Sequence, residues 1–341
     1  MYENLEEILK KGIALRASDI IFTVGVPISY RVNGKYTYLN PEYLTPEAAD
    51  YYIKLILGDE LFERLLVNKE VDTAIRLSGF NFRVGAYTQK GVHGASLRVL
   101  SNRIKSFEEL ELPAGLADLC KLDSGLILIT GTTGSGKSTT MAAMLEYINE
   151  NINGHIITIE DPIEFIYTSK KCIVDQKELG RDTKSFASAL KYVLREDPDV
   201  IAVGEMRDPE TIASAITCAE TGHLVISTLH TQNVAGSISR IIDAFDASLQ
   251  AQIRTQLAMS IRGVISQKLL PSATGVGRVV CYEFAPFNQA LRALIRTGKN
   301  HLIEGQVEIG KSEGMISYSR CLKSLYDNGK ITKEIYELNT L

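Results

Sequence analysis

The residues whose types and spacing point most directly to chemistry form one continuous run. The run comprises Gly131, Thr132, Thr133, Gly134, Ser135, Gly136, Lys137, Ser138 and Thr139. It matches the phosphate-binding pattern G-x-x-x-x-G-K-[ST], in which glycines let backbone N–H groups converge on phosphate oxygens. Lys137 can reach the β- and γ-phosphates of a nucleotide, and the Ser138 hydroxyl can bind Mg²⁺. A glycine-rich turn without a ligand is the alternative, but an apolar run before the pattern and a helical run after it favour a nucleotide.

Acidic residues follow two later apolar runs that we expect to be strands. Residues 156–159 lead to Glu164, and residues 199–203 lead to Glu205 and Asp208. A nucleoside triphosphatase needs carboxylates at such strand ends to hold Mg²⁺ and to orient water. We predict that Glu205 is catalytic and contributes to the metal site, because an acid after a buried strand is costly unless it is used or paired. Asp208 precedes a proline and is predicted to cap a helix, whereas for Glu164 a catalytic and a structural role are about equally compatible with the pattern.

A third apolar run, residues 223–228, leads to His230. A lone histidine is more often a hydrogen-bonded structural residue than a catalytic one. Here histidines stand at both ends of one run, which favours a functional role modestly. We expect His230 to sense the γ-phosphate or the neighbouring carboxylate.

The second half of the chain alternates apolar runs with helical patterns. The expected strands are GLILIT, HIITIE, DVIAVGE and HLVIST, and the expected helices cover residues 137–149, 185–195 and 209–220. Almost entirely apolar strands suit a parallel sheet covered on both faces, so we predict a doubly wound α/β domain. After Ala244 we expect mostly helix, with a strand-like interruption at residues 276–284.

The first half has a different pattern. Leu5, Ile8, Leu9 and Ile13 lie at helical spacing, Thr45 precedes a proline-started helix, and Asn33-Gly34 is typical of a two-residue hairpin turn. Together with several alternating runs, these features predict a small α+β domain with a mainly antiparallel sheet. We therefore divide the chain into residues 1–100, a linker at 101–113, an ATPase core at 114–270 and a mainly helical part at 271–341.

The composition of the chain favours some classes of protein and argues against others. The 341 residues are 45% hydrophobic and 23% charged, which suits a globular protein of two domains with full cores. The formal net charge of −4 and the lack of an aromatic-basic stripe argue against a nucleic-acid partner. No secretory signal or membrane span is apparent, and the five cysteines never have zinc-site spacing, so we expect reduced thiols, no zinc and a cytosolic protein.

Four sequence blocks together resemble the secretion ATPase superfamily of type II secretion and type IV pilus motors. They are GTTGSGKST, ITIEDPIEF, LREDPDVIAVGEMRDPET and TGHLVISTLHT, which are similar to that family's Walker A, Asp box, Walker B and His box. In the first half, residues 16–19 resemble its A-S-D entry, and Arg83 and Arg98 lie in runs similar to its arginine-bearing strands. Residues 290–296 are similar to the A-I-R-N-L-I-R signature of the retraction ATPases, although the pattern alone is explained by a packing helix.

The resemblance implies a PAS-like N-terminal domain joined to a RecA-like P-loop ATPase domain with a helical C-terminal extension. It further implies a ring-shaped homohexamer that binds ATP and Mg²⁺ between its two domains, with Arg83 and Arg98 as candidate arginine fingers. We expect a cytoplasmic motor at the inner face of the membrane that docks on an integral platform protein of the pilus machinery and drives pilus retraction and twitching motility. The alternatives are an assembly or competence ATPase of the same superfamily and, from another class, a nucleic-acid translocase.

Overall fold

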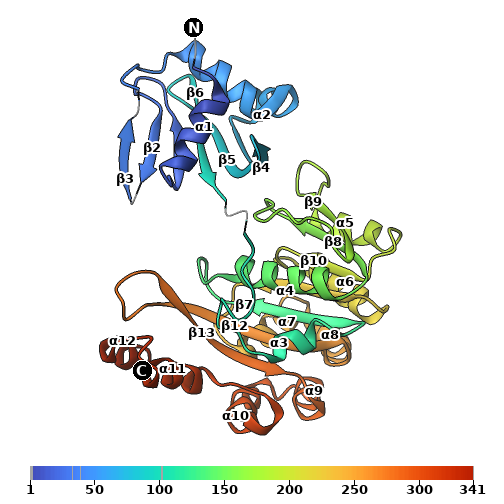
Figure 1. Ribbon diagram of the computed structural model, residues 1–341. Coiled ribbons are helices and arrows are strands. Elements are labelled where there is room, and N and C mark those ends of the chain that lie inside the picture. Colours follow the sequence, from blue (N-terminus) through green and yellow to red (C-terminus); the bar gives the residue numbers. More distant parts are fainter. Residues whose placement is uncertain (1–2, 33, 39, 101–102, 341) are drawn as a thin grey trace. The chain divides into compact units, whose positions relative to one another are not determined.

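A computed structural model gives the fold of residues 3–32, 34–38, 40–100 and 103–340 (Figure 1). Contacts between Cα atoms divide the chain into two compact units. The first unit contains Met1–Arg103 and Asp161–Ile166, and the second contains Ile104–Glu160 and Tyr167–Leu341. The domain boundaries given above remain predictions, and residues 101–102 of the expected linker lie outside the described residues.

The first unit is an antiparallel sheet with two helices. The sheet has the strand order β3-β2-β1-β6-β5-β4. Its strands are β1 (Asp19–Phe22), β2 (Ser29–Val32), β3 (Lys35–Tyr38), β4 (Glu70–Leu77), β5 (Phe80–Gln89) and β6 (Val92–Val99), and its helices are α1 (Leu5–Ala14) and α2 (Pro46–Asn68). The predicted α+β domain is confirmed, whereas Asn33 of the predicted hairpin turn lies outside the described residues.

Side chains in this sheet alternate between its two faces. The buried apolar side that packs with α1 and α2 includes Ile20, Phe22, Phe82, Val84 and Leu97. Successive residues of a strand point to opposite faces. The residues that alternate with this set, among them Arg83 and Arg98, therefore lie on the face away from the helices.

The second unit contains a seven-stranded sheet with the order β13-β12-β7-β11-β10-β8-β9. Its strands are β7 (Gly125–Thr130), β8 (Gly154–Glu160), β9 (Cys172–Glu178), β10 (Val200–Val203), β11 (Leu224–Leu229), β12 (Ile261–Pro271) and β13 (Arg278–Pro286). Neighbouring strands are parallel except for β13, which is antiparallel to β12. The predicted doubly wound sheet is confirmed.

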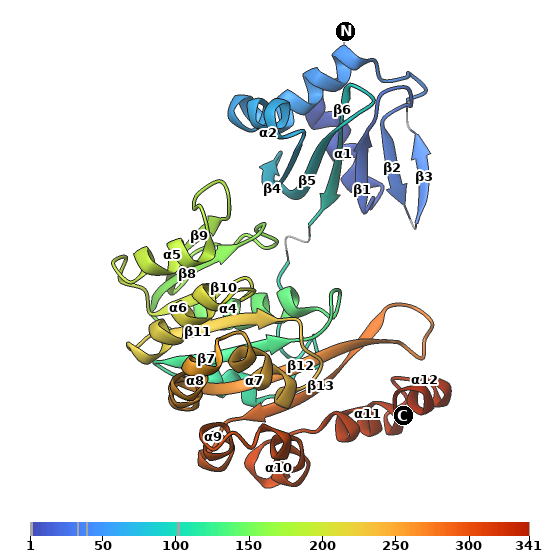
Figure 2. The same ribbon diagram turned by 180° about the vertical axis from the view of Figure 1, so that it is seen from behind.

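Helices cover both faces of this sheet, as Figures 1 and 2 show. The helices of this unit are α3 (Gly115–Leu119), α4 (Lys137–Asn151), α5 (Phe186–Val193), α6 (Pro209–Glu220), α7 (Val234–Asp243), α8 (Ala247–Ser260), α9 (Gln289–Arg296), α10 (Ile303–Ile309), α11 (Tyr318–Asp327) and α12 (Lys333–Thr340), with short 3₁₀ turns at Asn300–Leu302 and Gly310–Glu313. None of the helices in the described ranges is long and apolar enough to cross a bilayer.

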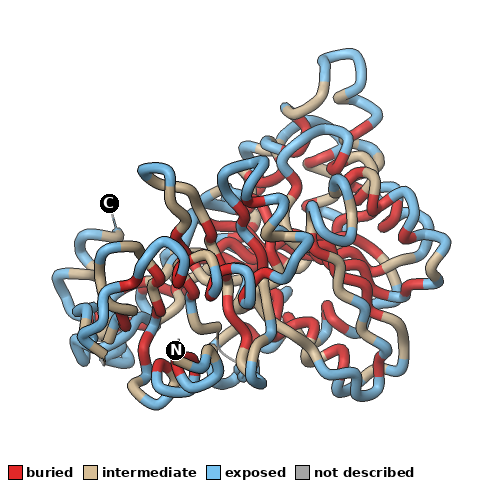
Figure 3. The backbone as a smooth tube through the Cα atoms, turned by 90° about the horizontal axis from the view of Figure 1, so that it is seen from above, coloured by how far each residue is buried: buried red, intermediate tan, exposed pale blue. Residues whose placement is uncertain are grey.

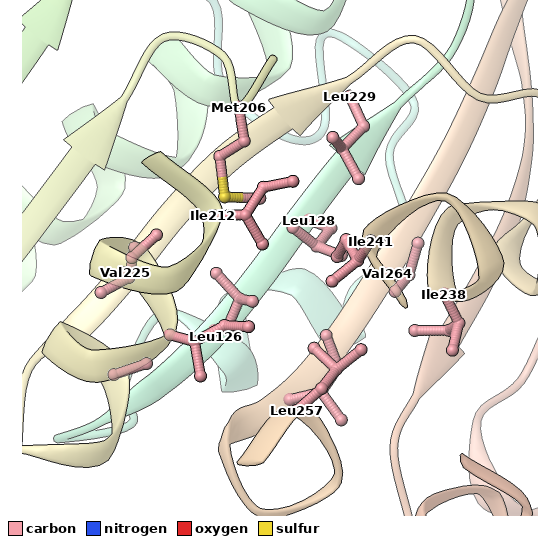
Figure 4. Packing of buried hydrophobic residues seen from close by; sticks show 14 of the residues in the cluster. Leu126, Leu128, Met206, Ile212, Val225, Leu229, Ile238, Ile241, Leu257 and Val264 are labelled. Atoms are coloured by element: carbon pink, nitrogen blue, oxygen red, sulfur yellow. The ribbon is translucent and has the colours of Figure 1, made fainter. Parts of the chain in front are cut away.

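Strand β7 shows how the two faces are filled. All six of its residues are buried, as expected for a strand between two helical layers. Figure 3 shows that buried backbone, in red, gathers in the interior and that exposed backbone, in pale blue, lies around it. Leu126 and Leu128 pack with helices α6, α7 and α8 (Figure 4), whereas Ile127 and Ile129 pack with α3 and α4 on the opposite face. The strand therefore contributes to two hydrophobic cores, one on each face of the sheet. This packing fixes the position of the residues that follow the strand.

Two predicted helix starts are confirmed by their capping bonds. The Thr45 hydroxyl accepts the N–H of Ala48 at the start of α2, at 3.2 Å. Asp208 Oδ1 accepts the N–H of Thr211 at the start of α6, at 2.9 Å. Such bonds satisfy N–H groups that a first helical turn leaves without partners.

Strand β12 was not predicted, and the expectation of mostly helix after Ala244 is wrong there. The apolar residues Ile261, Val264, Ile265 and Leu269 lie at spacings of three and four, which imitate a helix. In addition, the strand follows α8 directly, without the glycine or proline that often separates two elements. The strand-like interruption at residues 276–284 corresponds to β13, and the β12–β13 hairpin spans residue 271, the predicted start of the C-terminal part.

Candidate active site

The predicted site residues of the second unit follow three neighbouring strands. Strand β11 lies between β7 and β10, and both pairs are parallel. Strand β7 leads to Gly131, β11 leads to His230, and β10 leads to Glu205. Because carboxyl ends of parallel strands lie at one edge of a sheet, the fold brings the three segments to the same edge.

The phosphate-binding loop adopts a conformation that its glycines permit. Gly131, Gly134 and Gly136 have φ values of +146°, +77° and +91°, a region that other residues rarely adopt. At Gly131 a Cβ atom would lie 2.3 Å from the carbonyl oxygen of Gln267 and 2.4 Å from Ser135 Oγ. Glycine is therefore needed there for space as well as for conformation.

The start of helix α4 has the properties of an anion site. Gly136 is its N-cap, and no described side chain caps the helix. The first N–H groups of a helix lack partners within the helix and carry partial positive charge, so they attract phosphate. Thr132, Thr133 and Ser138 are exposed beside them, while the buried Ser135 hydroxyl has no hydrogen-bond partner within the described ranges. These observations fit a bound phosphate chain.

Lys137 lies against the loop that precedes it. Its ammonium group donates to the carbonyl oxygens of Gly131 at 2.9 Å and Thr132 at 3.1 Å, and the residue is buried. Charged oxygen acceptors form stronger hydrogen bonds with an ammonium group than neutral carbonyls do. The position of Lys137 therefore suits exchange of these carbonyls for phosphate oxygens.

Glu205 is held between two basic side chains. Its carboxylate contacts the guanidinium of Arg207, and His230 Nε2 lies 3.2 Å from its Oε2 atom. The latter distance permits an ion pair when His230 is protonated, and Oε2 has no hydrogen-bond partner among the described atoms. This side chain is 13% exposed. The structure thus brings Glu205 and His230 together and leaves one buried carboxylate oxygen available.

Arg83 and Arg98, of the first unit, lie directly opposite each other on β5 and β6. Arg83 donates two hydrogen bonds to Asp72, at 3.1 and 2.6 Å, and these bonds raise the pKa of its guanidinium. Arg98 donates to the buried carboxylate of Asp19 at 3.1 Å. Like charges opposite each other in a sheet are unfavourable, and the two acids offset that repulsion. The structure therefore shows pairing with acids, and a role for either arginine at a nucleotide remains a prediction.

Glu164 lies in the segment Asp161–Ile166, which the contacts between Cα atoms group with the first unit. The segment follows strand β8, as predicted, and Glu164 is partly buried. Its role as a second carboxylate remains a prediction.

Two buried polar residues of the β12–β13 hairpin are not among the predicted site residues. Gln267 on β12 contacts the phosphate-binding loop, and Glu283 on β13 accepts the N–H of Val234, at the start of α7, with its Oε2 atom at 2.7 Å. No motif marks either residue. Once β12 is assigned as a strand, however, a glutamine among apolar residues is a signal, because buried amides require partners.

The residues expected to hold Mg²⁺ have suitable chemistry. Magnesium prefers oxygen ligands and usually binds few protein groups together with phosphates and water. The exposed Ser138 hydroxyl and the available Glu205 oxygen are such ligands. Within the described ranges, no cluster of three or more histidine, cysteine, aspartate or glutamate side chains could hold a metal by itself. All five cysteines are buried free thiols.

Comparisons with known proteins show similarity over most of the chain. The family model for "Type II/IV secretion system protein" matches residues 1–279. The chain belongs to that family. It is 42% identical over 335 residues to the type IV pilus retraction ATPase PilT of Pseudomonas aeruginosa, an alignment that covers 97% of this chain and 96% of that protein.

Two further relatives of this family member are similarly close. A twitching motility protein of Neisseria gonorrhoeae is 43% identical over 305 residues, which cover 89% of this chain and 82% of that protein. A crystal structure of the pilus retraction motor PilT with bound ADP matches with a TM-score of 0.91 at 43% identity, and covers 98% of this chain and 96% of that chain. The expected family, its ATPase class and its two-part α/β fold are thereby confirmed.

Proposed function

We propose that this chain hydrolyses ATP to power retraction of a type IV pilus. The observation that supports the proposal best is the juxtaposition of a phosphate-binding loop with the Glu205–His230 pair at one sheet edge. Similarity over nearly the whole chain to a retraction ATPase indicates the process that the hydrolysis serves. We further propose a homohexamer at the inner face of the cytoplasmic membrane, docked on an integral platform protein of the pilus machinery.

The proposed roles follow from the chemistry of each side chain. Lys137 and the N–H groups at the start of α4 bind the β- and γ-phosphates. Ser138 holds Mg²⁺, and Glu205 orients the attacking water and adds to the metal site. Bound Mg²⁺ neutralises charge on the phosphates. His230, next to Glu205, senses whether the γ-phosphate is present.

We also propose roles in hydrolysis for residues that are grouped with the first unit. Arg83 and Arg98 supply positive charge to the γ-phosphate at a subunit boundary, and an arginine of this kind contributes about 10³- to 10⁵-fold in rate. Glu164 is the second carboxylate. ATP favours one arrangement of the units and hydrolysis releases it, which converts differential affinity into movement.

A variant that removes the ammonium group tests the enzymatic part. Lys137→Ala should abolish ATP binding and turnover, whereas Lys121→Ala, which removes an exposed lysine paired with Asp118, should leave both unchanged. ATPase activity of Lys137→Ala equal to that of the unaltered protein would contradict the site. Deletion of the gene tests the cellular part: pili should remain abundant while twitching is lost, and absence of pili would instead favour an assembly ATPase.

A further inference from the structure

We propose that Gln267 is a positioning residue for the phosphate-binding loop and fixes the direction of one N–H group that binds phosphate. The inference rests on the proposed nucleotide site. Gln267 lies on β12 and is only 4% exposed, and it contacts both the loop and helix α4.

Two hydrogen bonds hold the amide of Gln267. Its Nε2 donates to the backbone carbonyl of Ser135 at 2.8 Å, and its Oε1 accepts from the Thr140 hydroxyl at 2.9 Å. A carbonyl oxygen can only accept, so the nitrogen of the amide must face Ser135. The oxygen then faces Thr140, which can donate. The two contacts are consistent with a single orientation of the amide.

The bond to the Ser135 carbonyl also determines the direction of the N–H group of the next residue, Gly136. In a trans peptide the carbonyl oxygen of one residue and the N–H of the next point in opposite directions. Gln267 fixes the Ser135 carbonyl toward β12, which directs the N–H of Gly136 away from β12. Gly136 is the N-cap of α4, where an N–H group oriented in advance loses less entropy on binding phosphate.

The position of Gln267 is itself tightly determined. Ser266, the preceding residue, is paired with Thr130 at the end of β7. Gln267 then places its backbone oxygen in the space that a Cβ atom at Gly131 would occupy, at 2.3 Å. The strand thus contacts the loop at its first glycine through the backbone and near its last glycine through the side chain.

Burial makes a purely packing role for Gln267 costly. An amide removed from water loses free energy unless its polar atoms are bonded, and an apolar residue of similar size would avoid that requirement. The neighbours of Gln267 in β12 include the buried apolar residues Val264, Ile265 and Leu270. A glutamine in this strand is therefore explained by its two bonds.

Three variants separate orientation of the loop from general stability. Gln267→Leu removes both bonds, Gln267→Glu keeps the acceptor for Thr140 but loses the donor to Ser135, and Thr140→Val removes only the bond that orients the amide. Gln250→Leu is the control, because Gln250 also donates from Nε2 to a backbone carbonyl, that of Phe245, but does so on α8. For each variant, the affinity for a non-hydrolysable ATP analogue with Mg²⁺, kcat, KM and the unfolding midpoint without nucleotide are measured.

We expect Gln267→Leu and Gln267→Glu to weaken binding of the analogue about tenfold, the loss that one to two hydrogen bonds of typical strength would give. Thr140→Val should show a smaller loss, and Gln250→Leu none. A purely structural role would lower the unfolding midpoint and leave affinity unchanged below it. Affinity within about twofold of the unaltered protein in both Gln267 variants would overturn the inference.

The same measurements separate this inference from the proposed function. If the unaltered protein does not bind the analogue, the nucleotide site itself is wrong. If the unaltered protein binds it, Lys137→Ala does not, and the Gln267 variants bind normally, the nucleotide site holds and only the role of Gln267 is rejected.

Discussion

The imidazole Nε2 atom of His230 lies 3.2 Å from the Oε2 atom of Glu205, although the two residues follow different strands. The contact arises because β10 and β11 are parallel neighbours, with Val203 paired to Ser227. A carboxylate that is mostly buried needs a partner, and the Arg207 guanidinium pairs with Glu205 while the His230 ring lies beside it. These contacts hold the Glu205 carboxyl group at the sheet edge where we propose that water attacks.

Replacement of Glu205 by glutamine should separate binding from hydrolysis. Glutamine keeps the shape and removes the charge that orients water, so the affinity for ATP should be preserved while kcat falls by about 10²-fold or more. Equilibrium binding and steady-state turnover on the same preparation check this. Glu210→Gln, which alters an exposed glutamate on α6 paired with Lys191, is the control. Unchanged turnover in Glu205→Gln would assign the catalytic role to another carboxylate, first of all Glu164.

Replacement of His230 by asparagine should lower kcat about tenfold and leave the affinity for ADP unchanged, because the imidazole contacts the carboxylate and we propose that it senses only the γ-phosphate. Affinities for ADP and for a non-hydrolysable ATP analogue, measured separately, check the assignment. Equal losses for both nucleotides would show that His230 contributes to binding in general. His301→Asn, on an exposed histidine of the second unit, is a matched control.

Mixing two inactive variants tests whether Arg83 acts at the site of a neighbouring subunit. Arg83→Ala keeps the phosphate-binding loop, and Lys137→Ala keeps the arginine. If the arginine is supplied by the neighbour, mixed assemblies should regain ATPase activity that neither variant shows alone. Failure to regain activity in assemblies verified as mixed would contradict action between subunits. Asp72→Ala removes the same ion pair but leaves Arg83 in place, so it should keep activity.

Glu283 should make stability depend on pH. Burial raises the pKa of this carboxyl, and the nearby acids Glu304 and Glu308 add to the shift. Between the ordinary pKa and the raised one, the folded state binds more protons than the unfolded state, so the free energy of unfolding falls as pH rises through that window. The contribution of Glu283 to the free energy of unfolding is fully present below the ordinary pKa and is lost as pH rises through the raised one. Glu283→Gln should remove this slope.

Denaturant unfolding at a series of pH values checks the prediction for Glu283. The difference in unfolding free energy between Glu283→Gln and the unaltered protein should grow in favour of the variant as pH rises above about 4.5. Glu63→Gln, on an exposed glutamate of α2, should not reproduce this trend. Parallel curves for Glu283→Gln and the unaltered protein would contradict it.

The sequence predicted the elements that carry strong local signals. The apolar runs that became β7, β8, β10 and β11 are confirmed, because fully buried parallel strands have little choice of residue type. Strand β12 was missed, since its spacing of Ile261, Val264 and Ile265 suits a helix equally well. Its membership of the sheet depends on pairing with β7, which local sequence does not encode.

The candidate site was predicted in its main parts but not in its contacts. The order of β7, β11 and β10 brings Gly131, Glu205 and His230 to one edge, and strand ends with acids suggested such a grouping. The contact of Glu205 with Arg207 and the pairing of Arg83 with Asp72 depend on side-chain conformation and strand register. Neither is visible in a motif, and the roles assigned to these residues remain predictions.

The glycines of the loop meet separate demands. A side chain at Gly131 would collide with the backbone of Gln267, so it would push apart two strands in the middle of a sheet. Gly134 has open space around its missing Cβ, so replacement there would cost about 1–2 kcal/mol of local backbone strain and no more. The phosphate-binding loop is therefore also part of the packing between β7 and β12. A substitution at Gly131 would destabilise the folded protein even when no nucleotide is bound.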